Sequence, residues 1–188
     1  MPKVRFKELA KESIIQVSVK ASSLKGKRMT IRNATIEDLD EIASVEAECF
    51  LPLEAATKEE LYERLCVYSN HFWLLFDGDK LISFVDGFVT DEENLRDEMY
   101  ADASLHNENG AWQMIFGVNT IPSYRHLGYA SMVMRRVIEE ARNSGRKGLV
   151  LTCKDSLIMF YEALDFVLEG VSESTHGNVK WFQMRLTF

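Results

Sequence analysis

The sequence predicts one domain of the α/β (α+β) class, with a mixed, mostly antiparallel central sheet flanked by helices. Helical and strand patterns alternate along the chain, as they do when helices pack against a sheet. In HFWLLFDGDKLISFVDGFV, two apolar runs meet at Asp77-Gly78, a strong hairpin signal that requires antiparallel pairing. At 188 residues the chain is long enough to bury a sizeable single core.

The first half of the domain predicts one strand, two helices and the hairpin. In MTIRNATIEDLDEIASV, Met29 opens a first strand and helix, and Thr35 with Asp38 three residues later resembles a capping box ahead of an apolar helical stripe. Thr57 with Glu60 forms a clearer capping box before the second helix. The acidic stretch 90–109, after the hairpin, is expected to form a short helix and a loop.

The second half predicts strands and helices in alternation. AWQMIFGVN (111–119) is a continuous apolar run, as expected of a buried central strand. The helix that follows carries one apolar stripe and ends at Gly145. A buried strand (147–153), a helix in LIMFYEAL and strands in FVLEG and VKWFQMRLTF complete the domain.

Charge divides the chain into two parts. Residues 1–28 hold eight Lys or Arg and two Glu, which predicts a basic, loosely held N-terminal extension before a compact domain over 29–188. The domain holds fourteen Lys or Arg against twenty-seven acidic residues, which argues against nucleic-acid binding. No apolar run approaches the roughly 18 residues of a membrane span, and no signal-peptide core is seen, so a cytoplasmic location without a membrane partner is expected.

The three cysteines predict buried thiols. Cys49, Cys66 and Cys153 lie far apart, each within an apolar pattern, which does not suggest a disulfide framework. No cluster of His, Cys and carboxylate residues has metal-ligand spacing either, so no metal is expected.

The segment PSYRHLGYAS, between strand 111–119 and the next helix, predicts a phosphate cradle. The first amides of a helix lack internal partners and carry the positive end of the helix dipole. Gly128 and Ala130 would let a pyrophosphate approach that backbone closely, and Arg125 adds a formal charge. Neither the P-loop pattern nor a dinucleotide glycine triplet is present. On spacing alone, an ordinary loop before a helix remains the alternative.

Arg125-His-Leu-Gly128-Tyr-Ala130 behind a buried strand resembles the acyl-coenzyme A signature [QR]-x-x-G-x-[GA] of the GNAT N-acetyltransferase superfamily. LTCKDSLIMFYEALDF (151–166) resembles the strand and helix that follow it there, although Asp165 replaces the usual glycine. The chain looks most like the arylalkylamine N-acetyltransferase-related branch, including bacterial members. The resemblance implies a GNAT-type fold over 29–188 and direct transfer of acetyl from acetyl-CoA, the cosubstrate, to a small primary amine, with arylalkylamines as one option.

The resemblance also implies roles for individual residues. The backbone amides of Phe116 and Val118 on a bulged strand would polarise the thioester carbonyl. Tyr161 would be the general acid that protonates the leaving thiolate, with simple core packing as the alternative. The pyrophosphate would be held, chiefly by backbone, at Arg125, His126, Gly128, Tyr129 and Ala130.

The general base and the amine pocket are predicted less directly. Glu54 is the first choice for the base, with Glu46 and Glu48 as reserves and a solvated loop carboxylate as the alternative reading. Trp112 and Met114 stand where vertebrate members carry two histidines, so a histidine relay is not expected. The residues proposed to face the amine are Trp112, His176 and Trp181.

Two other functions stay open at this point. One is a non-catalytic acyl-CoA-binding or regulatory module, which would keep the cradle without needing Tyr161. The other is a protein-interaction domain with a degenerate pocket. A homodimer is compatible with the sequence, which does not determine the oligomeric state.

Overall fold

The computed structural model describes residues 29–174 and 179–188. The predicted extension 1–28 and His176 therefore lie outside the described residues. The strands are β1 (Met29–Asn33), β2 (Phe72–Asp77), β3 (Lys80–Thr90), β4 (Trp112–Thr120), β5 (Gly148–Cys153), β6 (Val167–Val171) and β7 (Phe182–Thr187). The α-helices are α2 (Leu39–Cys49), α3 (Lys58–Tyr68), α4 (Glu98–Ala101), α5 (Tyr129–Asn143) and α6 (Ile158–Glu162).

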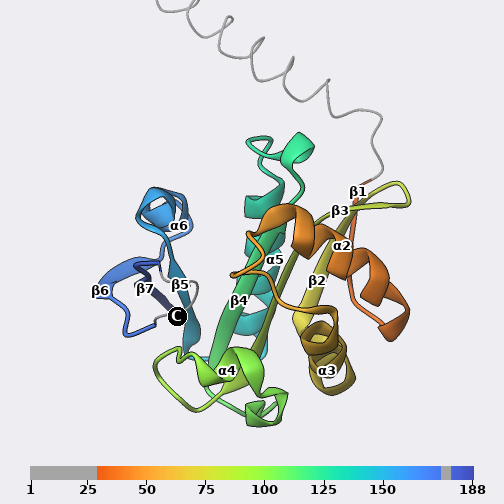
Figure 1. The fold of residues 1–188 in the computed structure, drawn as a ribbon. Coiled ribbons are helices and arrows are strands. Elements are labelled where there is room, and N and C mark those ends of the chain that lie inside the picture. Colours follow the sequence, from red (N-terminus) through yellow and green to blue (C-terminus); the bar gives the residue numbers. More distant parts are fainter. Residues whose placement is uncertain (1–28, 175–178) are drawn as a thin grey trace, which may run out of the picture.

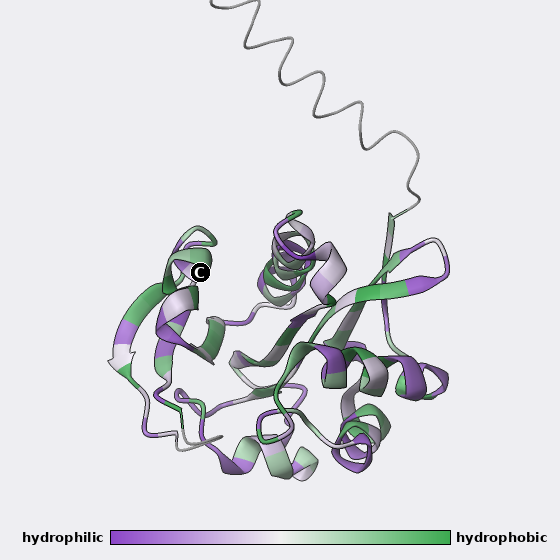
Figure 2. Cartoon of the chain, turned by 45° about the horizontal axis from the view of Figure 1, so that its top comes forward, coloured by the Kyte–Doolittle hydropathy of each residue, from purple (hydrophilic) through white to green (hydrophobic). Residues whose placement is uncertain are grey.

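The seven strands form one sheet in the order β1-β2-β3-β4-β5-β7-β6. Among the described strand pairs, β4 and β5 are parallel and the others antiparallel, which confirms the predicted mixed, mostly antiparallel sheet. Helix α5 covers one face of the sheet, and α2 and α3 cover the other (Figure 1). Hydrophobic residues concentrate along the central strands between these helices, where the core lies (Figure 2).

Local sequence signals position the helices as predicted. Thr57 Oγ1 accepts a hydrogen bond from the Glu60 amide at 3.2 Å, and Glu60 Oε2 accepts from the Thr57 amide at 2.7 Å, closing the capping box of α3. Thr35 and Asp38 form a similar box on a 3₁₀ turn (Ile36–Asp38) that leads into α2. The hairpin turns at Gly78, whose φ of +63° suits glycine.

The prediction that the cysteines are buried is confirmed for Cys153 and wrong for Cys66. Cys153 is buried, Cys49 is half-buried and Cys66 is exposed. The prediction for Cys66 is wrong because the buried face of α3 is formed by Leu61, Leu65 and Tyr68. Cys66 directly follows Leu65, and successive helical residues point about 100° apart, so its thiol faces solvent.

In the part of the chain that the structure describes, no helix combines the length and the apolar character needed to cross a membrane.

Candidate active site

A cavity of about 300 Å³ lies beside β4, where β4 and β5 separate. The parallel ladder between the two strands runs from Trp112 and Gly148 to Ile115 and Leu151, while β4 continues to Thr120. The register between β3 and β4 shifts at this level, because Asp86 pairs with Gly117 and Gly87 pairs with Ile115. Phe116 is therefore a β-bulge residue, which re-aims the backbone locally.

The bulge agrees with the predicted carbonyl-polarising strand. Phe116 and Val118 both line the cavity. Both lie on the section of β4 beyond its ladder with β5. Among the described strands, β3 still pairs with this section but β5 does not, so the backbone groups that point away from β3 have no strand partner there.

Glu46 forms one wall of the cavity. It projects from the face of α2 that also buries Ile42 and Val45, so the helix directs its carboxyl group toward the sheet. Its side chain is buried, and Oε1 accepts a hydrogen bond from the Ala56 amide at 2.9 Å. Burial, together with the negative charge of Asp86, raises the pKa of Glu46 to about 7, which makes it a proton acceptor matched to neutral pH.

Tyr161 also lines the cavity. It lies on α6, is buried, and packs its ring edge against Phe160 and Phe166. Burial raises the pKa of this phenol, so Tyr161 stays protonated at neutral pH. Cys153 also lines the cavity, and burial raises the pKa of its thiol to about 11.

Glu54 lies at the cavity too, but in an ion pair. Both of its carboxylate oxygens accept from Lys154 Nζ, at 2.9 Å and 2.8 Å, and its side chain is 4% exposed. The same ammonium group lies 5.8 Å from the ring centroid of Trp181, which is proposed to face the amine and lines the cavity. Glu48 is exposed on the other side of α2 and does not line the cavity.

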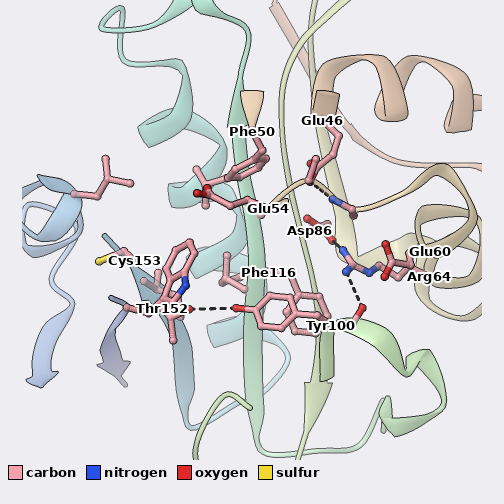
Figure 3. Close-up of a pocket in the computed structure, with 18 of the residues that line it drawn as sticks. Glu46, Phe50, Glu54, Glu60, Arg64, Asp86, Tyr100, Phe116, Thr152 and Cys153 are labelled. Carbon is pink, nitrogen blue, oxygen red and sulfur yellow. Dashed lines mark hydrogen bonds and ion pairs between the residues drawn. The ribbon is translucent and has the colours of Figure 1, made fainter. Parts of the chain in front are cut away.

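Three further cavity residues escaped the sequence reasoning: Arg64, Asp86 and Tyr100 (Figure 3). Tyr100 comes from α4, and its hydroxyl lies 3.2 Å from Thr152 Oγ1. Burial raises the pKa of Tyr100 to about 12. Charged residues within apolar patterns were the available signal, because Arg64 lies on the buried stripe of α3 and Asp86 interrupts the apolar run of β3.

The predicted phosphate cradle has an open backbone. Gly128 adopts φ +86° as the N-cap of α5, and a Cβ built there meets nothing within 4 Å. Within residues 29–174 and 179–188, no backbone carbonyl accepts from the amides of residues 126–131, and the first amide bonded into the helix is that of Met132, to Gly128 O at 3.0 Å. A ligand can thus reach several main-chain donors at once.

Side chains of the cradle differ in what they offer. Arg125 donates to the carbonyls of Thr120 at 3.0 Å and Cys49 at 3.3 Å, so part of its guanidinium fixes the loop. Tyr129 buries its side chain and offers only its backbone. His126 is exposed with φ +61°, and Ala130 is half-buried.

Trp112 does not line the cavity. It is buried at the start of β4, where the guanidinium of Arg185 lies 4.6 Å from its ring centroid. Four residues of strand, roughly 13 Å, separate it from Phe116. Asp165, by contrast, reproduces the geometry expected of a glycine, since it adopts φ +67° in the turn before β6.

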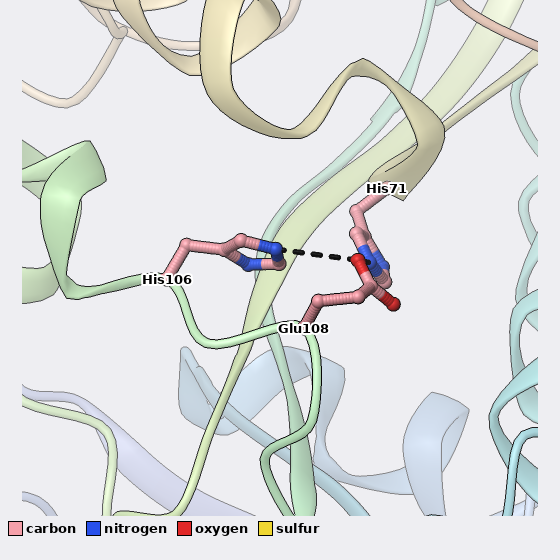
Figure 4. A group of neighbouring side chains, drawn as sticks. All are labelled: His71, His106 and Glu108. Carbon is pink, nitrogen blue, oxygen red and sulfur yellow. Dashed lines mark hydrogen bonds and ion pairs between the residues drawn. The ribbon is translucent and has the colours of Figure 1, made fainter.

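A second group of titratable residues gathers at the edge of the sheet, away from the cavity (Figure 4). Glu108 Oε2 lies 2.9 Å from His71 Nε2 and 3.3 Å from His106 Nε2, and this rim cluster brings three metal-type donors within 4.8 Å of one another. The spacing 71, 106, 108 does not reveal it in the sequence.

Hydrogen bonds indicate which ring nitrogens of the two histidines in the rim cluster carry protons. His106 Nδ1 accepts from the Val89 amide at 3.2 Å, so a neutral His106 carries its proton on Nε2 and offers no lone pair there. Gln113 Nε2 donates to two backbone carbonyls, which leaves Gln113 Oε1 to accept from His71 Nδ1. The arrangement therefore suits a proton network between His71, His106 and Glu108 better than a cation.

Comparison with known proteins agrees with the fold. The features available for comparison are a mixed sheet that opens beside the bulged strand β4 and the glycine-capped N-terminus of α5. Residues 37–166 match the model described as "Acetyltransferase (GNAT) family", so the chain belongs to this family, and the predicted resemblance is confirmed.

The individual proteins that resemble this chain share a quarter or less of their aligned residues with it. Serotonin N-acetyltransferase of Mesocricetus auratus is 24% identical over 160 residues, covering 82% of this chain and 75% of the relative. The loading GNATL domain of CurA from Lyngbya majuscula has a TM-score of 0.76 at 16% identity, covering 85% of this chain and 98% of that domain. The PaiA N-acetyltransferase of Thermoplasma acidophilum, solved with coenzyme A, has a TM-score of 0.64 at 16% identity, covering 86% and 99%.

Proposed function

We propose that the protein is an N-acetyltransferase that moves the acetyl group of acetyl-CoA to a primary amine by direct attack. One observation carries the proposal: Glu46, Tyr161 and the bulged part of β4 line the same cavity. Membership of the GNAT family supports it, and so does the name of the serotonin N-acetyltransferase relative.

The cosubstrate would be held mainly by main-chain groups. Open amides at residues 126–131 and the bare backbone of Gly128 suit a pyrophosphate. The amides of Phe116 and Val118 would stabilise the oxyanion that develops on the thioester carbonyl. The resemblance predicts the same residues, and the open backbone of the cradle supports that prediction.

Glu46 is the proposed base in place of Glu54. An alkylammonium ion has a pKa of about 10 and must lose a proton before its nitrogen can attack. The carboxyl group of Glu46, with a pKa of about 7, can accept that proton, whereas both oxygens of Glu54 are held by Lys154. As the C–N bond forms and the C–S bond breaks, the attacking nitrogen loses its second proton to solvent, and Tyr161 gives its proton to the thiolate and regains one from solvent.

Direct attack is proposed rather than an acyl-enzyme. The thiolate, not the thiol, is the nucleophilic form of cysteine. Cys153, the cavity cysteine, has its pKa raised to about 11 and is protonated at neutral pH. Acetyl transfer through Cys153 would therefore be slow.

The cavity lining supports an amine with an aromatic or other apolar group. Phe50, Tyr100 and Trp181 provide aromatic surface, and carboxyl groups of Glu46 and Glu60 favour a cationic head. An arylalkylamine fits this description. The relative named serotonin N-acetyltransferase adds support.

Release of coenzyme A thiol from acetyl-CoA, measured with arylalkylamines, polyamines, amino sugars and peptides, tests the proposal. We expect amine-dependent turnover, highest with arylalkylamines. Tyr161→Phe should lower turnover, and an unchanged rate would contradict its role as the acid. An acyl-CoA-binding module would show thermal stabilisation by coenzyme A without turnover, and an interaction domain would show neither.

A further inference from the structure

Arg64 and Asp86 form a buried ion pair at the floor of the cavity. Arg64 Nη1 lies 2.9 Å from Asp86 Oδ2, and the two side chains are 7% and 2% exposed. The chemistry proposed above uses neither group. Burying two charges carries a large desolvation cost, so a role beyond their mutual attraction is expected.

Arg64 connects three elements around the cavity. From α3, its Nη2 donates to the carbonyl of Tyr100 on α4 at 2.8 Å. Its guanidinium carbon lies 5.2 Å from the ring centroid of Phe116, the bulge residue. The ring of Tyr100 lies 4.9 Å from the same ring. Arg64 therefore holds α4 against the bulge of β4.

Asp86 lies on β3, opposite the bulge of β4. It pairs with Gly117 at the register shift, and a Cβ at Gly117 would lie 2.6 Å from Asp86 Oδ1. Glycine at 117 thus lets the carboxylate sit directly over the strand. Burial raises the pKa of Asp86, but the guanidinium 2.9 Å away favours the charged form, and we assign it as a carboxylate.

We propose that the Arg64–Asp86 pair is the positioning device of this active site, which fixes the bulge and Tyr100 and keeps a second negative charge beside Glu46. The inference rests on Glu46 as the base of the proposed function. It adds two positioning residues, neither of which exchanges a proton with the substrate.

Groups on several elements affect the ionisation of Glu46. Asp86 of β3 opposes its ionisation, and Arg64 of α3 favours it. Asn119 of β4 and the Ala56 amide also favour the carboxylate form, and Cys49 on α2 is close enough to interact with it. Because the two partners of the ion pair act on Glu46 in opposite directions, neutralising each one should move its pKa in opposite directions.

The test is a pair of substitutions read by two measurements. The first measurement is the pH profile of kcat/KM, and the second is the titration of the Glu46 carboxyl carbon by NMR, which does not need turnover. For Asp86→Asn we expect the acidic limb and the Glu46 titration to move to lower pH by about 1–3 pH units. For Arg64→Gln, which keeps a donor for the Tyr100 carbonyl, we expect both to move to higher pH as long as Asp86 stays ionised, and the NMR signal of the Asp86 carboxyl carbon in the same spectra reports its charge.

Matched controls separate this role from a loss of structure. Arg64→Lys preserves both charges and should leave the Glu46 titration in place, even if kcat falls. Asp38→Asn breaks another Arg–Asp pair, with Arg32 at 2.6 Å and outside the cavity lining, and should also leave it in place. If Asp86→Asn does not fold, the upward shift in Arg64→Gln and the unchanged value in Arg64→Lys decide the matter.

Failure of the inference differs from failure of the proposed function. If neither substitution moves the Glu46 titration, or both move it the same way, the pair does not set the charge state of Glu46. If Glu46→Gln keeps full activity, the assignment of the base is wrong, while the NMR titrations still decide the electrostatic part of the inference.

Discussion

Two clusters in this molecule shift the pKa of a glutamate in opposite directions. The cavity cluster consists of Glu46, Arg64 and Asp86, and the rim cluster consists of His71, His106 and Glu108. Burial beside Asp86 raises the pKa of Glu46 to about 7. Glu108 also pays for partial burial, but hydrogen bonds from His71 and Asn70 and the charges of His71 and Arg146 hold its pKa at about 2. The difference lies first in burial and then in the number of donors: Glu46 is buried, whereas Glu108 is largely exposed and meets several donors and positive charges.

The opposite pKa shifts predict that one glutamate affects turnover and the other affects the stability of the fold. A carboxyl group with a raised pKa destabilises the fold wherever it must ionise, and one with a lowered pKa stabilises it wherever the unfolded chain is ionised. Glu46 should therefore matter for turnover at a cost in stability, and Glu108 should matter for stability with little effect on turnover. Substitutions in the two clusters can break or sharpen this comparison.

The largest expected effect is on catalysis. Glu46→Gln removes the proton acceptor and keeps the size of the side chain, so kcat/KM with the best amine should fall by about 100-fold or more. Glu48→Gln, on the exposed side of the same helix, should leave it unchanged. Steady-state kinetics at pH 8 measure both, and a similar fall in the two variants would refute the assignment.

The same variant should be more stable than the wild type. The folded-state pKa of Glu46, about 7, lies above the ordinary value of 4.5, so its cost is absent below pH 4.5, grows as the pH rises, and is complete above pH 7. Glu46→Gln should then gain on the order of 3 kcal/mol in unfolding free energy at pH 8 and almost nothing at pH 4. Urea unfolding at the two pH values measures the difference.

Glu108→Gln should show the reverse behaviour. The pKa of Glu108 is lowered to about 2, so its stabilisation is present above pH 4.5 and is lost as the pH falls toward 2. The variant should be less stable at pH 6 and lose less stability between pH 4.5 and 2, with unchanged kcat/KM at pH 8. A variant as stable as the wild type at pH 6 would show that the rim cluster contributes nothing.

The smallest effect concerns a position outside both clusters. Gly128→Ala places a methyl group where a pyrophosphate is proposed to lie and forces a left-handed alanine, at about 1 kcal/mol of stability. KM for acetyl-CoA should rise roughly tenfold, equal to 1.4 kcal/mol of binding. Gly145→Ala is the control, because it has φ +73° and the same open surroundings at the other end of α5. It should lose similar stability and keep its KM.

Local patterns predicted the fold and part of the site. The order of elements, the hairpin at Gly78 and the glycine before α5 follow from periodicity and from short motifs, which act over a few residues. The bulge of β4 is instead implied by the resemblance to the GNAT family. The choice between Glu46 and Glu54 as the base does not follow from local patterns. It depends on how the connection 50–57 folds back so that the Ala56 amide reaches Glu46.

The buried partners could not be derived from spacing. Arg64 and Asp86 are 22 residues apart, and His71 and Glu108 are 37 residues apart. Each pair depends on packing between elements that are separate in the sequence. Sequence periodicity indicates that a charged residue lies on a buried face, but it does not identify the residue opposite.

The short ladder between β4 and β5 has a consequence for motion. It contains four residue pairs, against eight between β3 and β4 and six between β5 and β7. The ladder ends at the cavity, where the Glu54–Lys154 ion pair and the contact between Tyr100 and Thr152 also join the two parts of the sheet. A rotation of the C-terminal part about this ladder would have to break these contacts, so any widening of the cavity is tied to the loss of the Glu54–Lys154 ion pair.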